Sequence, residues 1–298
     1  MPLARGMGAL LPHPQSPGAS AEAPGAGYAL EGASPEALVI SGDGLDHDIV
    51  IEGPADSVDE LARELGPFED AAVAWEGSGL RMGVVIDDLG SGASLAYGAD
   101  EKFYPASSIK GPYVISVYET MVDTGIVSGD AVRRLAEPAI ISSDNDAYRA
   151  LRDLCGSQAF ADWAVACGAV EPGSEQYAQF ASHSYPRLSA RQLARMWGHA
   201  FAYLSEGSDG ARELVGLFER REESPIRAGV DASYLTLTKA GWYPEDDGGD
   251  SAASTCDAGI ILDGSHAYVV VIMTDAPADL DLLADLVPGI YSATVVLE

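Results

Sequence analysis

The chain has 298 residues, of which 47% are hydrophobic, so it is long enough to bury a sizeable core. Its 46 acidic residues outnumber 17 basic residues and give a formal net charge of −29. Because a field of this sign repels phosphate backbones and anionic headgroups, the composition argues against nucleic acid and membrane surfaces as partners, and solubility is the simplest reason for the charge. No apolar run reaches the length of a membrane span.

The first part of the chain is predicted to lie outside the folded domain. Residues 12–35 are rich in Pro, Gly, Ala and Ser, a composition typical of a flexible leader or linker. Residues 1–11 contain no sustained apolar segment of the kind that a secretory signal requires. We therefore assign residues 1–35 to a leader and residues 36–298 to one folded domain.

The next segments predict β-structure with one helix. Residues 48–51 are a short strand candidate, and Asp56-Ser57 predicts the cap of a helix that ends at Gly66-Pro67. Two alternating segments, residues 81–87 and 93–97, flank a glycine-containing turn and predict a hairpin.

The rest of the chain is predicted to be helical and then β again. Apolar residues recur at helical spacing from Val114 to Leu204. Strands are predicted at residues 234–238, 258–262 and 267–274, and a last helix at residues 280–286. This order predicts an α+β fold in which both chain ends build one antiparallel sheet flanked by helices, with an inserted helical subdomain at about residues 113–225.

Cysteine and histidine give no sign of a metal centre or a disulfide framework. The three cysteines form an odd set with no C-x-x-C spacing, and the five histidines show no H-E-x-x-H or paired arrangement. A G-x-S-x-G elbow is also absent from the sequence, which leaves a serine–histidine triad unsupported. We therefore expect inert buried thiols, no metal and no cofactor.

Lysine is used sparingly, with only Lys102, Lys110 and Lys239 against 14 arginines. An ammonium group loses its proton when it is desolvated or placed near another cation, whereas a guanidinium stays charged, so a retained lysine is a candidate base. Ser107 stands three residues before Lys110, which places both side chains on one face of a helix predicted to begin near Ser107. Free amides at that first turn favour a developing oxyanion.

Two further short motifs follow, and each has an ordinary explanation. Ser143-Asp144-Asn145 precedes a predicted helix and is typical of an N-cap, although the Ser143 hydroxyl could relay a proton and the Asn145 amide could hold a substrate amide. Lys239-Ala240-Gly241 is predicted to end a strand, where a solvated lysine would be unremarkable. Taken singly, each motif fits its ordinary explanation better.

The three motifs together are more specific. S-x-x-K, S-D-N and K-x-G occur in that order on a helix start, a loop before a helix and a strand, which is the motif set of class A β-lactamases and penicillin-binding proteins. The chain resembles that serine acyl-transferase family from about Asp56 to Glu298. The hairpin, the Phe103-Tyr104-Pro105-Ala106 approach to Ser107 and the late strand pair are similar to the family as well.

The resemblance implies a role for each matching residue. Ser107 matches the nucleophile, Lys110 the general base and Ser143 the relay to the leaving nitrogen. Substrate binding falls to Asn145, Lys239, Ala240 and Gly241, and the backbone N–H groups of Ser107 and Trp242 match the oxyanion hole. The implied chemistry is covalent: attack, an acyl-enzyme, then hydrolysis or transfer.

Three departures from the family pattern bear on turnover. Ala240 stands where the family has a hydroxyl that helps bind the substrate carboxylate. The family glutamate that activates the deacylating water has no clear match, and only Glu171 and Glu175 are weak candidates between residues 162 and 195. The stretch from Ser107 to Ser143 is also short, which implies a trimmed helical subdomain.

Two functions are therefore expected from the sequence. The first is a serine hydrolase or acyl-transferase acting through Ser107 on a β-lactam or a peptidoglycan-like peptide, with slow β-lactam hydrolysis, or an esterase acting on an unknown acyl substrate. The alternative is a β-lactamase-like domain that has lost turnover and only binds. The scarcity of lysine outside the motifs favours the enzyme. An extracytoplasmic location is implied by the family, although no signal peptide is legible.

Overall fold

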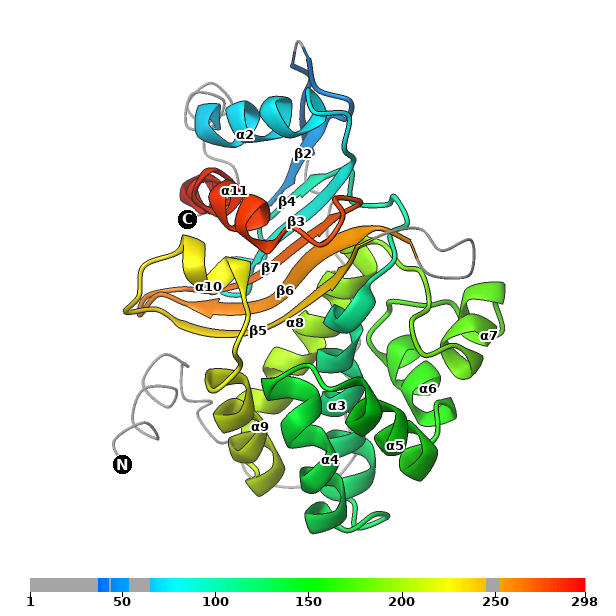
Figure 1. Cartoon of the computed structure of the whole chain (residues 1–298). Coiled ribbons are helices and arrows are strands. Elements are labelled where there is room, and N and C mark those ends of the chain that lie inside the picture. The colour runs from blue at the N-terminus through cyan, green and yellow to red at the C-terminus, as the bar shows by residue number, and fades with distance from the viewer. Residues whose placement is uncertain (1–36, 43, 54–64, 245–251, 298) are drawn as a thin grey trace.

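The computed structural model describes residues 37–42, 44–53, 65–244 and 252–297, drawn in colour in Figure 1. The predicted leader and the predicted cap at Asp56-Ser57 lie outside these ranges. Within them the chain forms an α+β domain, as predicted: a seven-stranded antiparallel sheet with helices on both faces.

The sheet is built from both ends of the chain. Its strands lie in the order β1-β2-β4-β3-β7-β6-β5, so the central pair joins an N-terminal strand to a C-terminal one. The strands are β1 (Leu38–Ile40), β2 (Ile49–Glu52), β3 (Met82–Asp88), β4 (Ser94–Tyr97), β5 (Leu235–Tyr243), β6 (Ser254–Leu262) and β7 (Ala267–Thr274). The predicted hairpin is the β3–β4 pair, in which Val84 faces Tyr97.

Gly66 begins α2 (Gly66–Glu76), with Pro67 in its first turn, where the missing N–H of proline would have no partner. The helix predicted to end at Gly66-Pro67 lies outside the described residues, apart from Leu65. One predicted boundary was wrong. Lys239-Ala240-Gly241 does not end a strand, because β5 continues to Tyr243 and pairs with β6 along its whole length. The lysine therefore projects from the interior of a strand.

The helices divide into two groups. The short α10 (Pro225–Gly229) and α11 (Leu280–Ser292) join α2 on one face of the sheet, with a core that includes Phe68 and Ile290. The other face is covered by the remaining helices, with a core centred on α8. These are α3 (Lys110–Val117), α4 (Gly129–Ile141), α5 (Asn145–Cys155), α6 (Gln158–Ala166), α7 (Glu175–Ser182), α8 (Ala190–Glu206) and α9 (Asp209–Glu219).

Three single-turn elements complete the described chain: the 3-10 turns η3 (Ala106–Ile109) and η5 (Ala293–Val296), and a π-helical turn, η4 (Tyr118–Val122), that continues α3. Within the described residues no helix is both long and apolar enough to span a bilayer.

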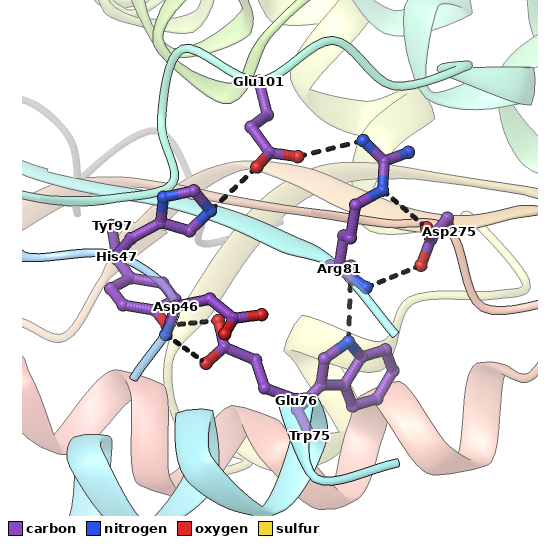
Figure 2. Close-up of polar contacts among 8 residues, drawn as sticks. All are labelled: Asp46, His47, Trp75, Glu76, Arg81, Tyr97, Glu101 and Asp275. Carbon is purple, nitrogen blue, oxygen red and sulfur yellow. Dashed lines mark hydrogen bonds and ion pairs between the residues drawn. The ribbon is translucent and has the colours of Figure 1, made fainter. Parts of the chain in front are cut away.

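A cluster of paired polar side chains fastens the N-terminal strands to the rest of the sheet (Figure 2). Arg81, just before β3, bonds Glu101 at 3.0 Å and Asp275 at 2.9 Å. The other oxygen of Glu101 lies 2.8 Å from Nε2 of His47. Glu76, at the end of α2, accepts hydrogen bonds from the Tyr97 hydroxyl and from the backbone N–H of Asp46. We call this set of residues the Arg81 cluster.

Candidate active site

The Ser107 turn lies at the junction of the sheet and the helices. Ala106 has a positive φ of 44°, in a region that residues with a Cβ rarely adopt, and it begins the 3-10 turn η3 that runs into α3. Ser108 is buried and its hydroxyl bonds the Pro105 carbonyl at 2.7 Å. Ser107 is half-buried, and its own hydroxyl makes no hydrogen bond among the described residues. It is therefore the serine of this turn that is open to a ligand.

Gly241 sets the close approach of β5 to this turn. A Cβ built on Gly241 would lie 2.6 Å from the backbone nitrogen of Ser107 and 2.3 Å from that of Ser108. No residue with a side chain fits at this distance, so glycine is required here for steric reasons. Trp242 is half-buried and directly follows Gly241 in β5, so its backbone lies beside the same turn.

Lys110, the first residue of α3, is fully buried, and among the described residues it donates hydrogen bonds only to uncharged oxygens. Its Nζ lies 2.5 Å from the Ser143 carbonyl, 2.7 Å from Oδ1 of Asn145 and 3.4 Å from the Asp144 carbonyl. It also lies 5.5 Å from the centre of the Tyr148 ring. Burial lowers the pKa of Lys110 to about 8, against the opposing charge of Asp144.

The three residues of the Ser143-Asp144-Asn145 motif have different partners. Asp144 is an ordinary N-cap, with Oδ1 accepting from the N–H of Ala147 at 2.7 Å. Ser143 adopts a left-handed φ of 59°, and its hydroxyl and carbonyl each bond a lysine. The cap explanation thus applies to Asp144, while Ser143 and Asn145 face the buried lysines.

Lys239 approaches Ser143 from the sheet. Its Nζ lies 3.0 Å from the Ser143 hydroxyl and 2.8 Å from the Ala240 carbonyl, and the side chain is almost fully buried. Burial first, and then the positive charge of Lys110, lower the pKa of Lys239 to about 7. Ser143 therefore lies between two amines whose pKa values have moved toward neutrality. The Ala240 side chain is fully buried and offers no hydroxyl.

Tyr185, in the loop between α7 and α8, belongs to the same cluster and was not predicted. Its hydroxyl donates to Oδ1 of Asn145 at 3.2 Å. Its ring lies 5.9 Å from that of Tyr104 and 5.6 Å from that of Tyr148, and Tyr104 in turn lies 5.7 Å from Tyr243. No short sequence pattern marks this tyrosine, because its partners lie far away along the chain.

The two glutamates considered as deacylating bases remain outside this network. Glu171 lies before α7 and Glu175 is its first residue, and both are exposed. Neither carboxylate makes a hydrogen bond or ion pair with another described residue, and Lys110 has no carboxylate partner among them. Within all the described residues, no group of His, Cys, Asp and Glu is arranged to hold a metal ion.

Comparison with known proteins identifies the family. The model of the beta-lactamase enzyme family matches residues 69–131 and 128–291, so the chain belongs to this family and the resemblance drawn from the three motifs is confirmed. Beta-lactamase AST-1 of Nocardia asteroides is 34% identical over 103 residues. That match covers 26% of this chain and 33% of the relative, so the chain spans about a third of the length of this curated relative.

Solved structures share the fold. A beta-lactamase from Chitinophaga pinensis superposes with a TM-score of 0.62 at 17% identity, over 79% of this chain and 99% of that one. The structure of PBP-A superposes with a TM-score of 0.61 at 20% identity, over 82% of this chain and 99% of that one. At these identities the likeness establishes the fold alone, and function depends on the site.

Proposed function

We propose that the protein is a serine acyl-transferring enzyme that takes a β-lactam or a peptidoglycan-like peptide through an acyl-enzyme at Ser107. The observation that carries the proposal is the chain of hydrogen bonds in which Ser143 joins Lys110 to Lys239. These are two of only three lysines in the sequence, and both are buried with no carboxylate bonded to them among the described residues. A purely structural site would gain nothing from two such groups.

The proposed chemistry assigns each group a step. Lys110, in its neutral form, takes the proton of the Ser107 hydroxyl as the oxygen attacks the substrate carbonyl. The backbone N–H groups of Ser107 and Trp242 hold the oxyanion. Ser143 gives its proton to the leaving nitrogen as the C–N bond breaks, and the proton held by Lys110 then restores it. Lys239 supplies positive charge beside Ser143.

Substrate binding follows from the same assignment. Asn145 would hold the substrate amide, while the strand at Ala240 and Gly241 would flank the acyl group. Ala240 offers no hydroxyl to a substrate carboxylate, so we infer weaker binding of penicillins, by about 1 kcal/mol for one ordinary hydrogen bond.

We infer slow turnover. Releasing an acyl group from Ser107 needs a base that holds water, and neither Glu171 nor Glu175 is held near Lys110 by any described contact. The acyl-enzyme should therefore persist. A steady-state assay with a chromogenic cephalosporin tests this inference. Rapid repeated turnover without a detectable adduct would mean that a deacylating base exists. Glu171 and Glu175 would then be the first positions to mutate.

The assignment of Ser107 is tested by intact mass after exposure to benzylpenicillin. We expect one covalent adduct on the wild type and none on Ser107→Ala. Ser142→Ala is the matched control, because this exposed hydroxyl beside the motif bonds only the Pro138 carbonyl. An undiminished adduct on Ser107→Ala would overturn the assignment, and a folded wild type with no adduct from any acylating compound would favour the alternative of a binding domain without turnover.

Two further points complete the proposal. We propose that residues 36–298 act as one domain whose helical part, about residues 113–225, supplies Ser143 and Asn145, while the sheet supplies Lys239. An extracytoplasmic location is proposed on the ground of family membership and of a peptidoglycan-like substrate.

A further inference from the structure

Asn145 has its side-chain oxygen fully engaged while the residue itself is exposed. Oδ1 accepts one hydrogen bond from Lys110 Nζ at 2.7 Å and a second from the Tyr185 hydroxyl at 3.2 Å. A carboxamide oxygen has two lone pairs, so both are used. The Nδ2 group, which carries the two donors, must then point away from these partners, toward the accessible side of the residue.

Tyr185 is held in place from several sides. Its ring is flanked by those of Tyr104 and Tyr148, at 5.9 Å and 5.6 Å. Its loop is fixed where the Tyr148 hydroxyl bonds the Ser184 carbonyl at 3.0 Å, and where Leu188 exchanges two backbone hydrogen bonds with Phe103. These contacts connect the tyrosine to α5 and to the approach to Ser107, so its hydroxyl has little freedom to leave Asn145.

The chemistry of the phenol limits what it can do. Burial raises the pKa of Tyr185 to about 12, so near neutral pH the group is an un-ionised donor and cannot serve as a base for water. What it offers to the site is a directed hydrogen bond. The partner that receives this bond is the single asparagine of the 298-residue sequence.

We propose that Tyr185 is a positioning residue which, together with Lys110, fixes the orientation of the Asn145 carboxamide so that Nδ2 is presented to an acceptor on the substrate. The inference rests on the proposed function. The acceptor is the substrate amide already assigned to Asn145 under the proposed function, and what is new is the role of Tyr185. Acyl donors without that amide carbonyl should not depend on Tyr185.

Acylation by two related compounds tests the proposal. Benzylpenicillin has the side-chain amide, and 6-aminopenicillanic acid lacks it. We expect Tyr185→Phe, which keeps the ring, to slow acylation by benzylpenicillin about fivefold to tenfold, the effect of one directed hydrogen bond, and to leave acylation by 6-aminopenicillanic acid unchanged. Equal slowing with both compounds would make Tyr185 merely structural, and no change with either would overturn its role.

Tyr177→Phe is the matched control. This tyrosine lies on α7, and its hydroxyl bonds Asp162 at 2.6 Å, away from Asn145. We expect this variant to react with both compounds as the wild type does. If Tyr177→Phe slowed acylation by benzylpenicillin as much as Tyr185→Phe does, the proposal would be overturned. The effect would then come from any tyrosine in this part of the chain and not from the bond to Asn145.

A second measurement needs no acylation and separates this proposal from the proposed function. Selective labelling with 15N-asparagine gives a single side-chain amide signal pair, that of Asn145. We expect this pair to become more mobile, with a lower order parameter, in Tyr185→Phe and not in Tyr177→Phe. An unchanged signal overturns the positioning role. A wild type that forms no adduct with either compound overturns the proposed function instead. In that case the NMR signal of Asn145 still decides whether Tyr185 fixes its orientation.

Discussion

In the Arg81 cluster each cation faces a carboxylate, whereas the two lysines of the candidate active site donate hydrogen bonds only to uncharged oxygens among the described residues. The Arg81 side chain is 52% exposed, while Lys110 and Lys239 are almost completely buried. Pairing and exposure let a charge stabilise the fold at small cost. Burial without a counter-charge raises the cost of the charged form, and that cost is what turns a lysine into a base.

The largest expected effect is that of Lys110→Arg. Arginine keeps the charge but cannot give up its proton, so acylation by benzylpenicillin should fall by about a hundredfold to ten-thousandfold, the usual contribution of a general base. The rate of adduct formation by intact mass measures this. Lys102→Arg is the control, since Lys102 bonds Gln192 outside the site and should have no effect. Rapid acylation of Lys110→Arg would mean that Lys110 is not the base.

The pH dependence of acylation should show the same property in the wild type. The pKa values of about 8 for Lys110 and about 7 for Lys239 mean that both amines are protonated near pH 6 and that a neutral amine appears as the pH rises. Because the proposed chemistry needs Lys110 neutral and Lys239 charged, we expect the acylation rate constant to increase about fivefold between pH 6 and pH 8 and to fall at higher pH. A flat profile over this interval would contradict a lysine base.

Lys239→Met should raise the free energy of unfolding at pH 7, by about 1–3 kcal/mol, while abolishing function. The pKa of Lys239 is lowered from 10.5 in the folded protein, so the unfolded chain binds more protons. The cost of burial is therefore complete below about pH 7 and disappears as the pH rises toward 10.5. Denaturant titrations at pH 6, 7 and 9 should show a gain that shrinks with pH, and a gain that grows with pH would contradict the argument.

Arg81→Ala should change the free energy of unfolding in the opposite direction to Lys239→Met, and by less. Removing an exposed arginine from two carboxylates should lower the free energy of unfolding by about 1 kcal/mol, less at high salt, and leave acylation unchanged. Arg212→Ala, which removes one exposed ion pair on α9, is the control and should change stability by less. If Arg81→Ala stabilises the protein, the contrast between the two regions is wrong.

The main architecture could be predicted because it depends on local patterns. Apolar spacing distinguished the helical middle of the chain from the strands at both ends, and the hairpin turn contains the glycines that turns require. The error at Lys239-Ala240-Gly241 came from a residue with two structural meanings. Gly241 can end a strand or let a strand pass close to another backbone, and the second holds.

The motif residues could be named from the sequence, but their surroundings could not. Nothing near Asp144 shows that it alone caps α5 while its two neighbours turn to the lysines. Tyr185 lies 40 residues from its partner Asn145, and such a contact exists only after the helices have packed. Local spacing therefore indicates which groups are present, while tertiary structure decides which of them meet.

The central β3–β7 pair has a consequence for how the protein is made. Strand β3 is complete at Asp88, but its partner β7 begins at Ala267, so nearly 180 residues must be synthesised before this edge is covered. Until then a strongly apolar strand has an open edge that could pair with a neighbouring chain. Loop closure over this distance also makes the last step of folding slow. The protein should therefore depend on chaperone protection during synthesis, and the candidate active site around Ser107 should be complete only when the final strands are in place.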